Sequence, residues 1–188
     1  MAFLIAAAGL SGSGKSTALQ HLRELCAGEI VYLGGIVLEQ FRERGVVPCP
    51  ENERSVRLDI RRQHGPAALA ILAAPVVERY LNDGINVLID AIFAIDEYRE
   101  LQRLRGISKS ALFAVNVSFE TRCGRLCSRT DRPLTLEQVK ERDKIEIATL
   151  RTAAVIAEAD YTIINEYSME TFQNNLERFW KKLTDSTL

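Results

Sequence analysis

A glycine-rich stretch near the amino terminus constrains the fold of this chain more than any other feature. Residues 9–16 read Gly-Leu-Ser-Gly-Ser-Gly-Lys-Ser, which matches the pattern Gly-x-x-x-x-Gly-Lys-Ser/Thr. An apolar run over residues 3–8 precedes the stretch, and a helical pattern over residues 14–26 follows it. A strand, a glycine-rich loop and a helix in this order are typical of a P-loop. The sequence therefore predicts a phosphate-binding loop between a buried strand and a helix.

The residue types in this loop suit the binding of ATP and Mg²⁺. Glycines let main-chain N–H groups turn toward phosphates, and the amino terminus of the helix adds partial positive charge. We expect Lys15 to reach the β- and γ-phosphates and to be catalytic, and the Ser16 hydroxyl to bind Mg²⁺. The loop residues predicted to bind the nucleotide are Gly9, Ser11, Gly12, Ser13, Gly14, Lys15, Ser16 and Thr17. ATP and Mg²⁺ are therefore the predicted cofactors.

A second Mg²⁺ ligand is predicted at the end of another apolar run. Residues 86–90 read Asn-Val-Leu-Ile-Asp, so a carboxylate follows directly on a strand-like segment. P-loop proteins place an acidic side chain at the end of a neighbouring strand, where it helps to hold the metal. Asp90 is the predicted partner of Ser16. The alternative is an ordinary aspartate in the turn that ends a strand.

Short apolar runs alternate with longer amphipathic ones along the chain, and this alternation predicts an α/β fold. A parallel sheet covered by helices on both faces, a three-layer doubly wound fold, gives this pattern. The predicted strands are residues 3–8, 30–33, 86–90, 111–117 and 161–164. The predicted helices are residues 14–26, 36–44, 51–64, 66–82, 96–104, 119–128, 135–157 and 168–183. We expect residues 1–188 to form a single domain.

Composition narrows the classes of partner. The chain has 188 residues, 47% of them hydrophobic, which is enough for one sizeable core. A net charge of −1 argues against bulk electrostatic binding to nucleic acid. No apolar run is long enough to span a bilayer, so no membrane partner is expected. Four cysteines without Cys-x-x-Cys spacing fit a reduced, cytoplasmic protein.

Basic side chains are concentrated between residues 122 and 144. Arg122, Arg125 and Arg129 recur at spacings of three and four, so a helix would present them on one face. Arginines that close over moving phosphoryl oxygens stabilise the charge of the transition state. Pro133 breaks the helical pattern, so we predict a mobile lid around residues 125–142, with Arg129 and Arg132 as catalytic residues. The alternative is a solvated basic face paired with neighbouring glutamates.

Several motifs together resemble the P-loop kinases that act on nucleoside monophosphates, and within them dephospho-CoA kinase and its relatives. The resemblance covers nearly the whole chain, and the P-loop is its most specific part. The motifs are the P-loop itself, Arg61 before Gly65-Pro66, the run ending at Asp90, Arg129-Thr-Asp-Arg132-Pro, Glu141-Arg142-Asp143, and residues 159–165, which read Ala-Asp-Tyr-Thr-Ile-Ile-Asn.

The resemblance implies a five-stranded parallel sheet in the order 2-3-1-4-5, a helical lid, and transfer of the γ-phosphate of ATP to a small-molecule acceptor. It implies that Arg125 or Arg129 lies near the adenine or the phosphates and that Asn165 borders the base. It further implies that Arg132 and Arg142 close on the transferring group. The acceptor would lie in the helical region 35–82, with Arg61 facing it.

The sequence departs from these kinases on the acceptor side. They carry an acidic residue and then an arginine after the second strand, whereas residues 33–38 read Leu-Gly-Gly-Ile-Val-Leu. Two functions therefore compete. The first is a kinase for a nucleotide or nucleotide-like acceptor, of the dephospho-CoA or nucleoside monophosphate class. The second is an ATP-binding switch that transfers nothing. A kinase that modifies RNA or DNA is less favoured, because the basic residues cluster at the predicted lid.

Overall fold

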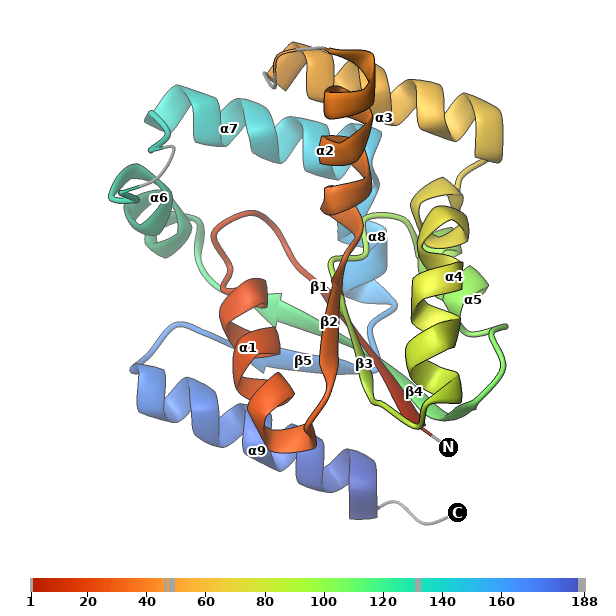
Figure 1. The fold of residues 1–188 in the computed structure, drawn as a ribbon. Helices are drawn as coiled ribbons and strands as arrows, with labels where there is room; N and C mark the ends of the chain where they lie inside the picture. Colours follow the sequence, from red (N-terminus) through yellow and green to blue (C-terminus); the bar gives the residue numbers. More distant parts are fainter. Residues whose placement is uncertain (1, 46, 48–49, 131–132, 186–188) are drawn as a thin grey trace.

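Five parallel strands form one sheet in the order β2-β3-β1-β4-β5 (Figure 1). The computed structural model describes residues 2–45, 47, 50–130 and 133–185. The strands are β1 (Ala2–Ala8), β2 (Glu29–Tyr32), β3 (Val87–Asp90), β4 (Ile107–Asn116) and β5 (Tyr161–Ile164). Each overlaps a predicted strand, so the parallel sheet and its order are confirmed.

Helices cover both faces of the sheet, which confirms the three-layer arrangement (Figure 1). The helices on one face are α1 (Lys15–Cys26) and α9 (Met169–Asp185). Those on the other face are α2 (Leu33–Arg44), α3 (Pro50–His64), α4 (Ala68–Asn82), α5 (Ile95–Leu101) and α8 (Thr152–Ala157). The helices α6 (Phe119–Cys127) and α7 (Leu136–Lys144) and the π-helix η1 (Ile145–Thr149) follow β4.

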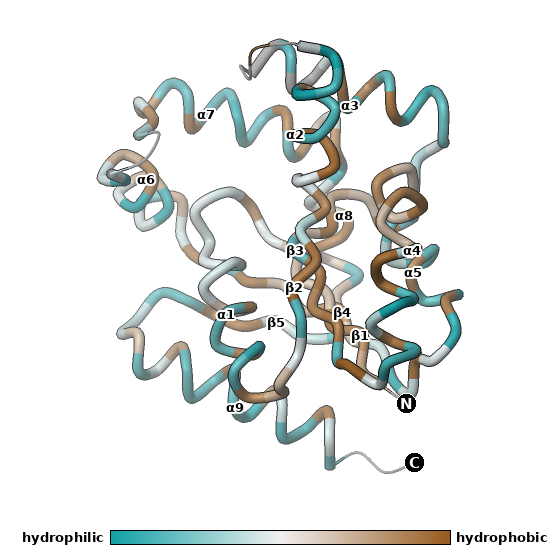
Figure 2. The backbone as a smooth tube through the Cα atoms, in the orientation of Figure 1, coloured by the Kyte–Doolittle hydropathy of each residue, from teal (hydrophilic) through white to brown (hydrophobic). Residues whose placement is uncertain are grey.

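The central strand β1 supplies both halves of the core. Leu4 and Ala6 belong to the cluster under α2, α4 and α5, whereas Ile5 and Ala7 belong to the cluster under α1 and α9. Successive strand residues point to opposite faces, and a sheet covered on both sides buries both sets. The apolar colour of the strands in Figure 2 reflects this double burial.

Several predicted boundaries differ from the observed ones, and two of the differences bear on the site. Leu33 was predicted to end the second strand, but β2 ends at Tyr32 and Leu33 begins α2, where it is fully buried. The helix predicted over residues 135–157 is interrupted. It is α-helical only to Lys144, widens into η1 and then breaks at Arg151, which has a left-handed φ of 59°. Tertiary contacts of η1, described below, override the helical pattern of the sequence.

Parallel pairing brings the carboxyl ends of the strands to one edge of the sheet. Ala7 of β1 pairs with Asp90 of β3, and Tyr32 of β2 pairs with the same aspartate. In open α/β sheets, ligands bind outside this edge. The loops that leave it therefore build the candidate site. Among the described residues, no helix combines the length and the apolar character needed to cross a membrane.

Candidate functional site

The loop between β1 and α1 has the backbone of a phosphate-binding loop. Gly9, Gly12 and Gly14 have φ values of 143°, 82° and 100°, a region that favours glycine. A Cβ atom at Gly9 would lie 2.6 Å from the carbonyl oxygen of Val115 in β4. A Cβ atom at Gly14 would collide with the side-chain nitrogen of Asn165. The glycines are thus required both by the turn and by close packing at the sheet edge.

Lys15 folds over this loop. Its Nζ donates hydrogen bonds to the carbonyl oxygens of Gly9, at 2.7 Å, and Leu10, at 3.1 Å. Burial of the ammonium group lowers the pKa of Lys15, and the negative charges of Glu146 and Asp90 act against that lowering. A cation enclosed by the loop is placed to bind phosphate.

The structure brings the two predicted Mg²⁺ ligands together. Ser16 lies in the first turn of α1 and Asp90 ends β3, and the Ser16 Oγ donates a 2.8 Å hydrogen bond to the Asp90 Oδ2. Mg²⁺ is often held by one or two protein oxygens together with phosphates and water. A hydroxyl and a carboxylate in contact, beside a phosphate loop, fit that coordination. Thr17 follows Ser16 in the same exposed turn.

Asn165, just after β5, connects the P-loop with α6. The side-chain Nδ2 of Asn165 donates a 2.8 Å hydrogen bond to the carbonyl oxygen of Ser13. The main-chain carbonyl oxygen of Asn165 accepts a 2.9 Å hydrogen bond from Arg125 Nη2. Among the described residues, the buried Ser13 Oγ and Arg125 Nη1 atoms have no hydrogen-bond partner. Buried polar atoms without partners are costly unless a ligand satisfies them. The residues present here therefore fit a bound nucleotide.

A buried ion pair between α6 and α7 was missed by sequence reasoning. Arg122 donates from Nη1 and Nη2 to the two carboxylate oxygens of Asp143, at 2.8 and 2.7 Å. Its Nη1 also donates to the carbonyl oxygen of Ser11, at 3.2 Å. Arg122 was predicted to share one basic face with Arg125 and Arg129, but it points inward instead. The spacing of arginines could not show which one faces an acid 21 residues away.

Glu146 is the second residue that sequence reasoning missed. It lies in η1, is only 3% exposed, and accepts a 2.9 Å hydrogen bond from the main-chain nitrogen of Ser11. The Ser11 hydroxyl donates to its other oxygen, which also accepts a 3.0 Å bond from Arg142 Nε. Arg142 is therefore linked to the loop through a glutamate. In the sequence, Glu146 was only one of the neighbouring glutamates that the alternative to a lid would pair with a solvated basic face.

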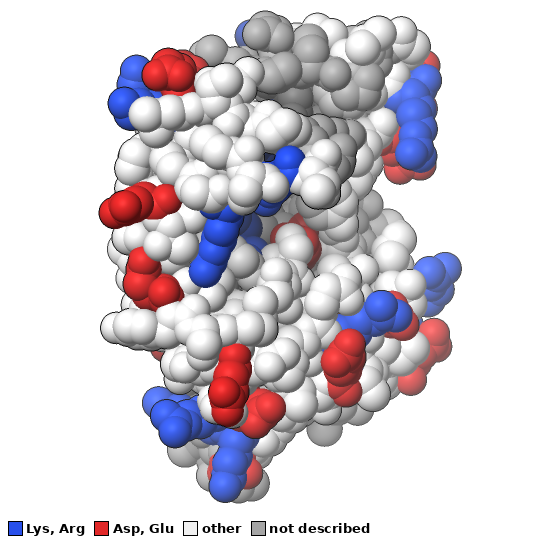
Figure 3. Space-filling model, turned by 90° about the vertical axis from the view of Figure 1, so that its left-hand side faces the viewer, with Lys and Arg blue, Asp and Glu red and all other residues white. Residues whose placement is uncertain are grey.

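Of the two arginines predicted to be catalytic in the lid, only Arg129 belongs to the described residues. Arg129 is exposed beyond the end of α6, and Arg132 lies outside the described residues. Figure 3 shows the face of the molecule that carries α6, α7 and α9, with basic side chains around a hollow in its centre. Residues 125–142, predicted to form a mobile lid, run from the end of α6 into α7, and the Arg122–Asp143 ion pair joins these two helices, the α6–α7 hairpin.

Helix α3 contacts the loop that follows β3 and the helix α5. Arg61 Nη2 lies 3.6 Å from the Oε1 of Glu97, which is fully buried in α5. The Glu97 Oε2 accepts hydrogen bonds from the main-chain nitrogens of Phe93 and Ala94. The guanidinium of Arg57, one turn before Arg61, lies 5.2 Å from the centre of the Phe93 ring. Burial raises the pKa of Glu97, against the effect of these bonds and cations.

The stretch that lacks the expected acid and arginine begins beside the side chain of Tyr32. A Cβ atom added at Gly34 would meet the outer end of the Tyr32 ring, which would have to shift. This ring is 53% exposed at the end of β2. An exposed aromatic ring thus lies next to the start of α2, where residues 33–38 carry neither the acid nor the arginine.

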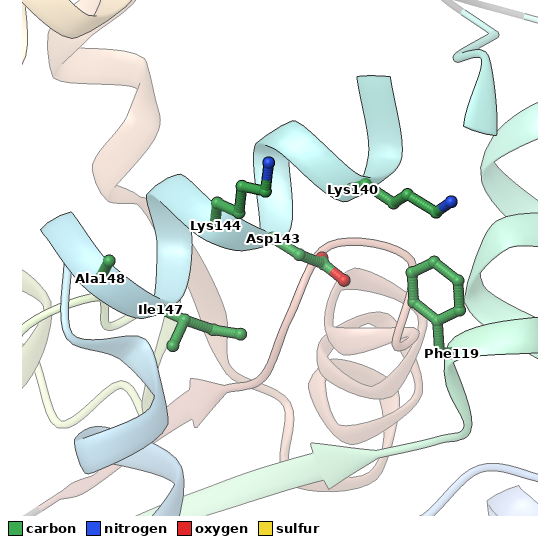
Figure 4. Close-up of a pocket in the computed structure, with 6 residues that line it drawn as sticks. All are labelled: Phe119, Lys140, Asp143, Lys144, Ile147 and Ala148. Atoms are coloured by element: carbon green, nitrogen blue, oxygen red, sulfur yellow. The ribbon is translucent and has the colours of Figure 1, made fainter. Parts of the chain in front are cut away.

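A separate open pocket of about 420 Å³ lies between α6 and the α7–η1 segment (Figure 4). Its lining consists of Phe119, Lys140, Asp143, Lys144, Ile147 and Ala148. In Figure 4 the carboxylate of Asp143 points toward the P-loop, while the two lysines extend away from it. The Arg122–Asp143 pair therefore stands between this pocket and the loop.

Comparison with known structures shows the same fold in P-loop kinases. A shikimate kinase from Acinetobacter baumannii, solved with shikimate, has a TM-score of 0.58 and 17% identity, and the match covers 100% of this chain and 96% of that one. A shikimate kinase from Aquifex aeolicus has a TM-score of 0.56 and 16% identity, over 98% and 99% of the two chains. These likenesses confirm the kinase-like P-loop fold that the sequence resemblance implied.

Sequence comparison shows the family. The sequence model of the AAA domain, AAA_18, matches residues 5–148. A UPF0200 protein from Hyperthermus butylicus is 34% identical, over 96% of this chain and 95% of the relative. A UPF0200 protein from Methanococcus maripaludis is 31% identical, over 96% and 97%. With its P-loop, its parallel sheet and these full-length matches, the chain belongs to the UPF0200 family and contains the P-loop domain described by AAA_18.

Proposed function

We propose that this protein is an ATP- and Mg²⁺-dependent kinase for a small-molecule acceptor of the nucleotide class. The observation that carries the proposal is the contact between Ser16 and Asp90 beside a loop with the backbone of a P-loop. Phosphoryl transfer needs positioning and charge stabilisation more than acid–base chemistry, so a P-loop lysine and a metal site supply its main requirements.

The residues proposed to hold the nucleotide lie in the P-loop, for the phosphates and the metal, and beside it, for the base. Lys15 and the amides of residues 11–16 would bind the phosphates, and the Ser16–Asp90 pair would hold Mg²⁺, which neutralises phosphate charge when bound. Asn165 and Arg125 would border the base, because they lie together beside Ser13. Arg142 would stabilise the transferring group, and Arg129 and Arg132 would complete the lid.

The acceptor is proposed to bind between the start of α2, α3 and the loop after β3, within residues 35–82 and their neighbours. Arg61, backed by the buried Glu97, would bind an anionic group of the acceptor. The exposed ring of Tyr32 offers a face on which a planar base can stack. A cation for the phosphate and an aromatic face for the base suit nucleotide-like acceptors, such as a nucleoside monophosphate or dephospho-CoA.

A change at the metal site tests the cofactor part of the proposal. We expect Asp90→Asn to reduce the stabilisation that ATP gives the protein in the presence of Mg²⁺, because a metal ligand loses its charge. Without Mg²⁺ the variant and the unmodified protein should respond to ATP alike. The measurement is the thermal shift with ATP, with and without the metal. Equal responses under both conditions would argue against a metal role for Asp90.

A change on α3 tests the acceptor part. We expect Arg61→Ala to raise the KM for the acceptor by at least about tenfold, because one charge-assisted hydrogen bond is lost. The affinity for ATP should stay the same. Arg62→Ala is the matched control, since Arg62 is the next residue and its side chain is 77% exposed. Steady-state kinetics with each substrate varied separately distinguish the two effects, and a change in ATP affinity alone would contradict the assignment.

The reaction itself is tested with a panel of acceptors. Nucleoside monophosphates, nucleosides and CoA precursors are incubated with the protein, Mg²⁺ and ATP, and ADP release is followed. We expect one class to raise ADP release above the rate of ATP hydrolysis and to become phosphorylated. If none does so, while ATP still binds, the kinase proposal is wrong.

The second candidate function is a nucleotide-dependent switch that transfers nothing. Two observations favour it. Residues 33–38, which include Gly34 and Gly35, lack the acid and the arginine that such kinases carry after the second strand, and the P-loop is bonded directly to η1 through Ser11. A switch requires that nucleotide binding be coupled to a movable element. Tight ATP binding with a conformational change and only slow hydrolysis would support this candidate over the first.

A further inference from the structure

Ser11, in the middle of the P-loop, is bonded on both sides by charged groups from the α6–α7 hairpin and η1. Its main-chain nitrogen and its hydroxyl both donate to the carboxylate of Glu146, and its carbonyl oxygen accepts from Arg122. In P-loops, main-chain N–H groups and hydroxyls at such positions face phosphate oxygens. Here a carboxylate of the protein itself accepts those hydrogen bonds.

The surroundings of Glu146 resemble those of a bound anion. The carboxylate accepts from Arg142 Nε at 3.0 Å, and among nearby charges it is the one that acts most strongly on Lys15. The side chain is only 4% exposed, so its charge is stabilised by these donors rather than by water. Its two oxygens thus use three donors that suit phosphate: the Ser11 nitrogen, the Ser11 hydroxyl and Arg142.

The position of Glu146 along the loop indicates which phosphate it would oppose. Asn165 contacts the loop at Ser13 and Gly14, and this is the side proposed for the base. Glu146 contacts the loop at Ser11, away from Asn165, and together with Arg142. A phosphate far from the base is the terminal one of a triphosphate. A diphosphate lacks that group.

We propose that Glu146 is a specificity-determining residue whose carboxylate competes with the terminal phosphate of a nucleoside triphosphate for Ser11 and Arg142. The inference rests on the proposed nucleotide site. A triphosphate displaces the carboxylate and a diphosphate does not. Glu146 therefore leaves Ser11 only when a triphosphate is bound, and Arg142 then loses its bond to Glu146. Two like charges cannot share one set of donors without a large energetic cost.

The hairpin can remain docked while Glu146 moves. Asp143 lies one turn before Glu146 on the same segment and keeps its two hydrogen bonds to the buried Arg122. Arg142 is 48% exposed, so its side chain has room to rotate away from Glu146. The exchange is therefore local, confined to the start of η1 and the last turn of α7. It would report the terminal phosphate to a segment that covers the loop.

The test compares Glu146→Gln with the unmodified protein and with Glu141→Gln. Glu141 lies on the same segment and its side chain is 64% exposed. Its Oε2 forms a surface ion pair with the Nζ of Lys144 at 3.5 Å, so Glu141 is a matched control for the loss of one negative charge. Dissociation constants are measured by calorimetry for the Mg²⁺ complexes of a non-hydrolysable ATP analogue and of ADP. We expect Glu146→Gln to bind the analogue at least about tenfold more tightly, because a competing like charge is removed. The gain for ADP should be much smaller, and the control should behave like the unmodified protein.

A second variant guards against a folding defect. Glu146→Asp keeps the charge but shortens the side chain by one methylene, which withdraws the carboxylate from Ser11. Relative to the unmodified protein, this variant too should gain more affinity for the analogue than for ADP. Circular dichroism verifies the fold of both variants. Unchanged or weaker binding of the analogue by the folded variants, or an equal gain for ADP, overturns the inference. If the unmodified protein binds neither nucleotide, the proposed nucleotide site itself is wrong, which is a different result.

Discussion

Lys15→Ala is expected to abolish the stabilisation of the protein by ATP and to reduce any phosphate transfer by at least about a hundredfold, the usual effect of removing one preorganised charge-stabilising group. The lysine ammonium is enclosed by the loop and bonded to two loop carbonyl oxygens, so the substitution removes the cation from the loop itself. Thermal shift with ATP and initial rates with the best acceptor measure the two effects. Lys181→Ala, an exposed lysine on α9, is the control.

The same variant should leave the stability of the nucleotide-free protein unchanged or higher. Burial lowers the pKa of Lys15, which means that the folded state disfavours the charged form relative to the unfolded chain. The shift also predicts a pH dependence. Only the ammonium form attracts phosphate, so the affinity for ATP should fall as the pH rises toward 10.5, and the fall should begin below the range of an ordinary lysine. A variant that loses stability but still binds ATP would contradict the functional assignment.

Asp143→Ala is expected to destabilise the protein by about 3 kcal/mol, because it leaves the buried guanidinium of Arg122 without its partner. The side chains of Arg122 and Asp143 are 6% and 12% exposed, so water cannot replace the lost carboxylate easily. For a chain of this length such a loss lowers the melting temperature by roughly 6–12 °C. Denaturant unfolding monitored by circular dichroism measures the change.

Two further variants separate charge from packing at this pair. Glu141→Ala, which removes the acid of an exposed pair on the same helix, should cost less than about 1 kcal/mol. Replacing both buried partners together, Arg122→Met with Asp143→Leu, should recover most of the stability, because no unpaired charge remains. A double variant as unstable as Asp143→Ala would show that the loss comes from packing rather than from the unpaired arginine.

The fold could be predicted from the sequence because its signals are local. Alternating apolar runs marked all the strands, and the glycine-rich pattern fixed the connection of β1 to α1. Ser16 and Asp90 could be paired because Asp90 ends one strand and Ser16 follows the loop that leaves another. Parallel strands bring both ends to the same edge of the sheet. The contacts of the α6–α7 hairpin and η1 could not be predicted in this way. Spacing along the sequence does not show which of several arginines faces Asp143, or that Glu146 turns toward the loop.

The hydrophobic periodicity of the sequence also could not predict that the helix is interrupted after Lys144. Residues 135–157 have a pattern that suits one continuous helix, but η1 and the left-handed Arg151 divide it. Local propensity is overridden here by the hydrogen bonds that Glu146 makes with Ser11. A departure from regular helix at a functional site is common for π-helical turns.

The wide turn of η1 determines the direction in which the side chains that follow α7 point. In a regular α-helix each added residue rotates the next side chain by about 100°, so one residue more or fewer in this turn would direct a different side chain at the P-loop. Relatives that differ by a single insertion or deletion between residues 144 and 150 would therefore lose the Glu146 contact even if the glutamate itself were retained. Length in this short segment, and not only residue identity, is the property to compare across the family.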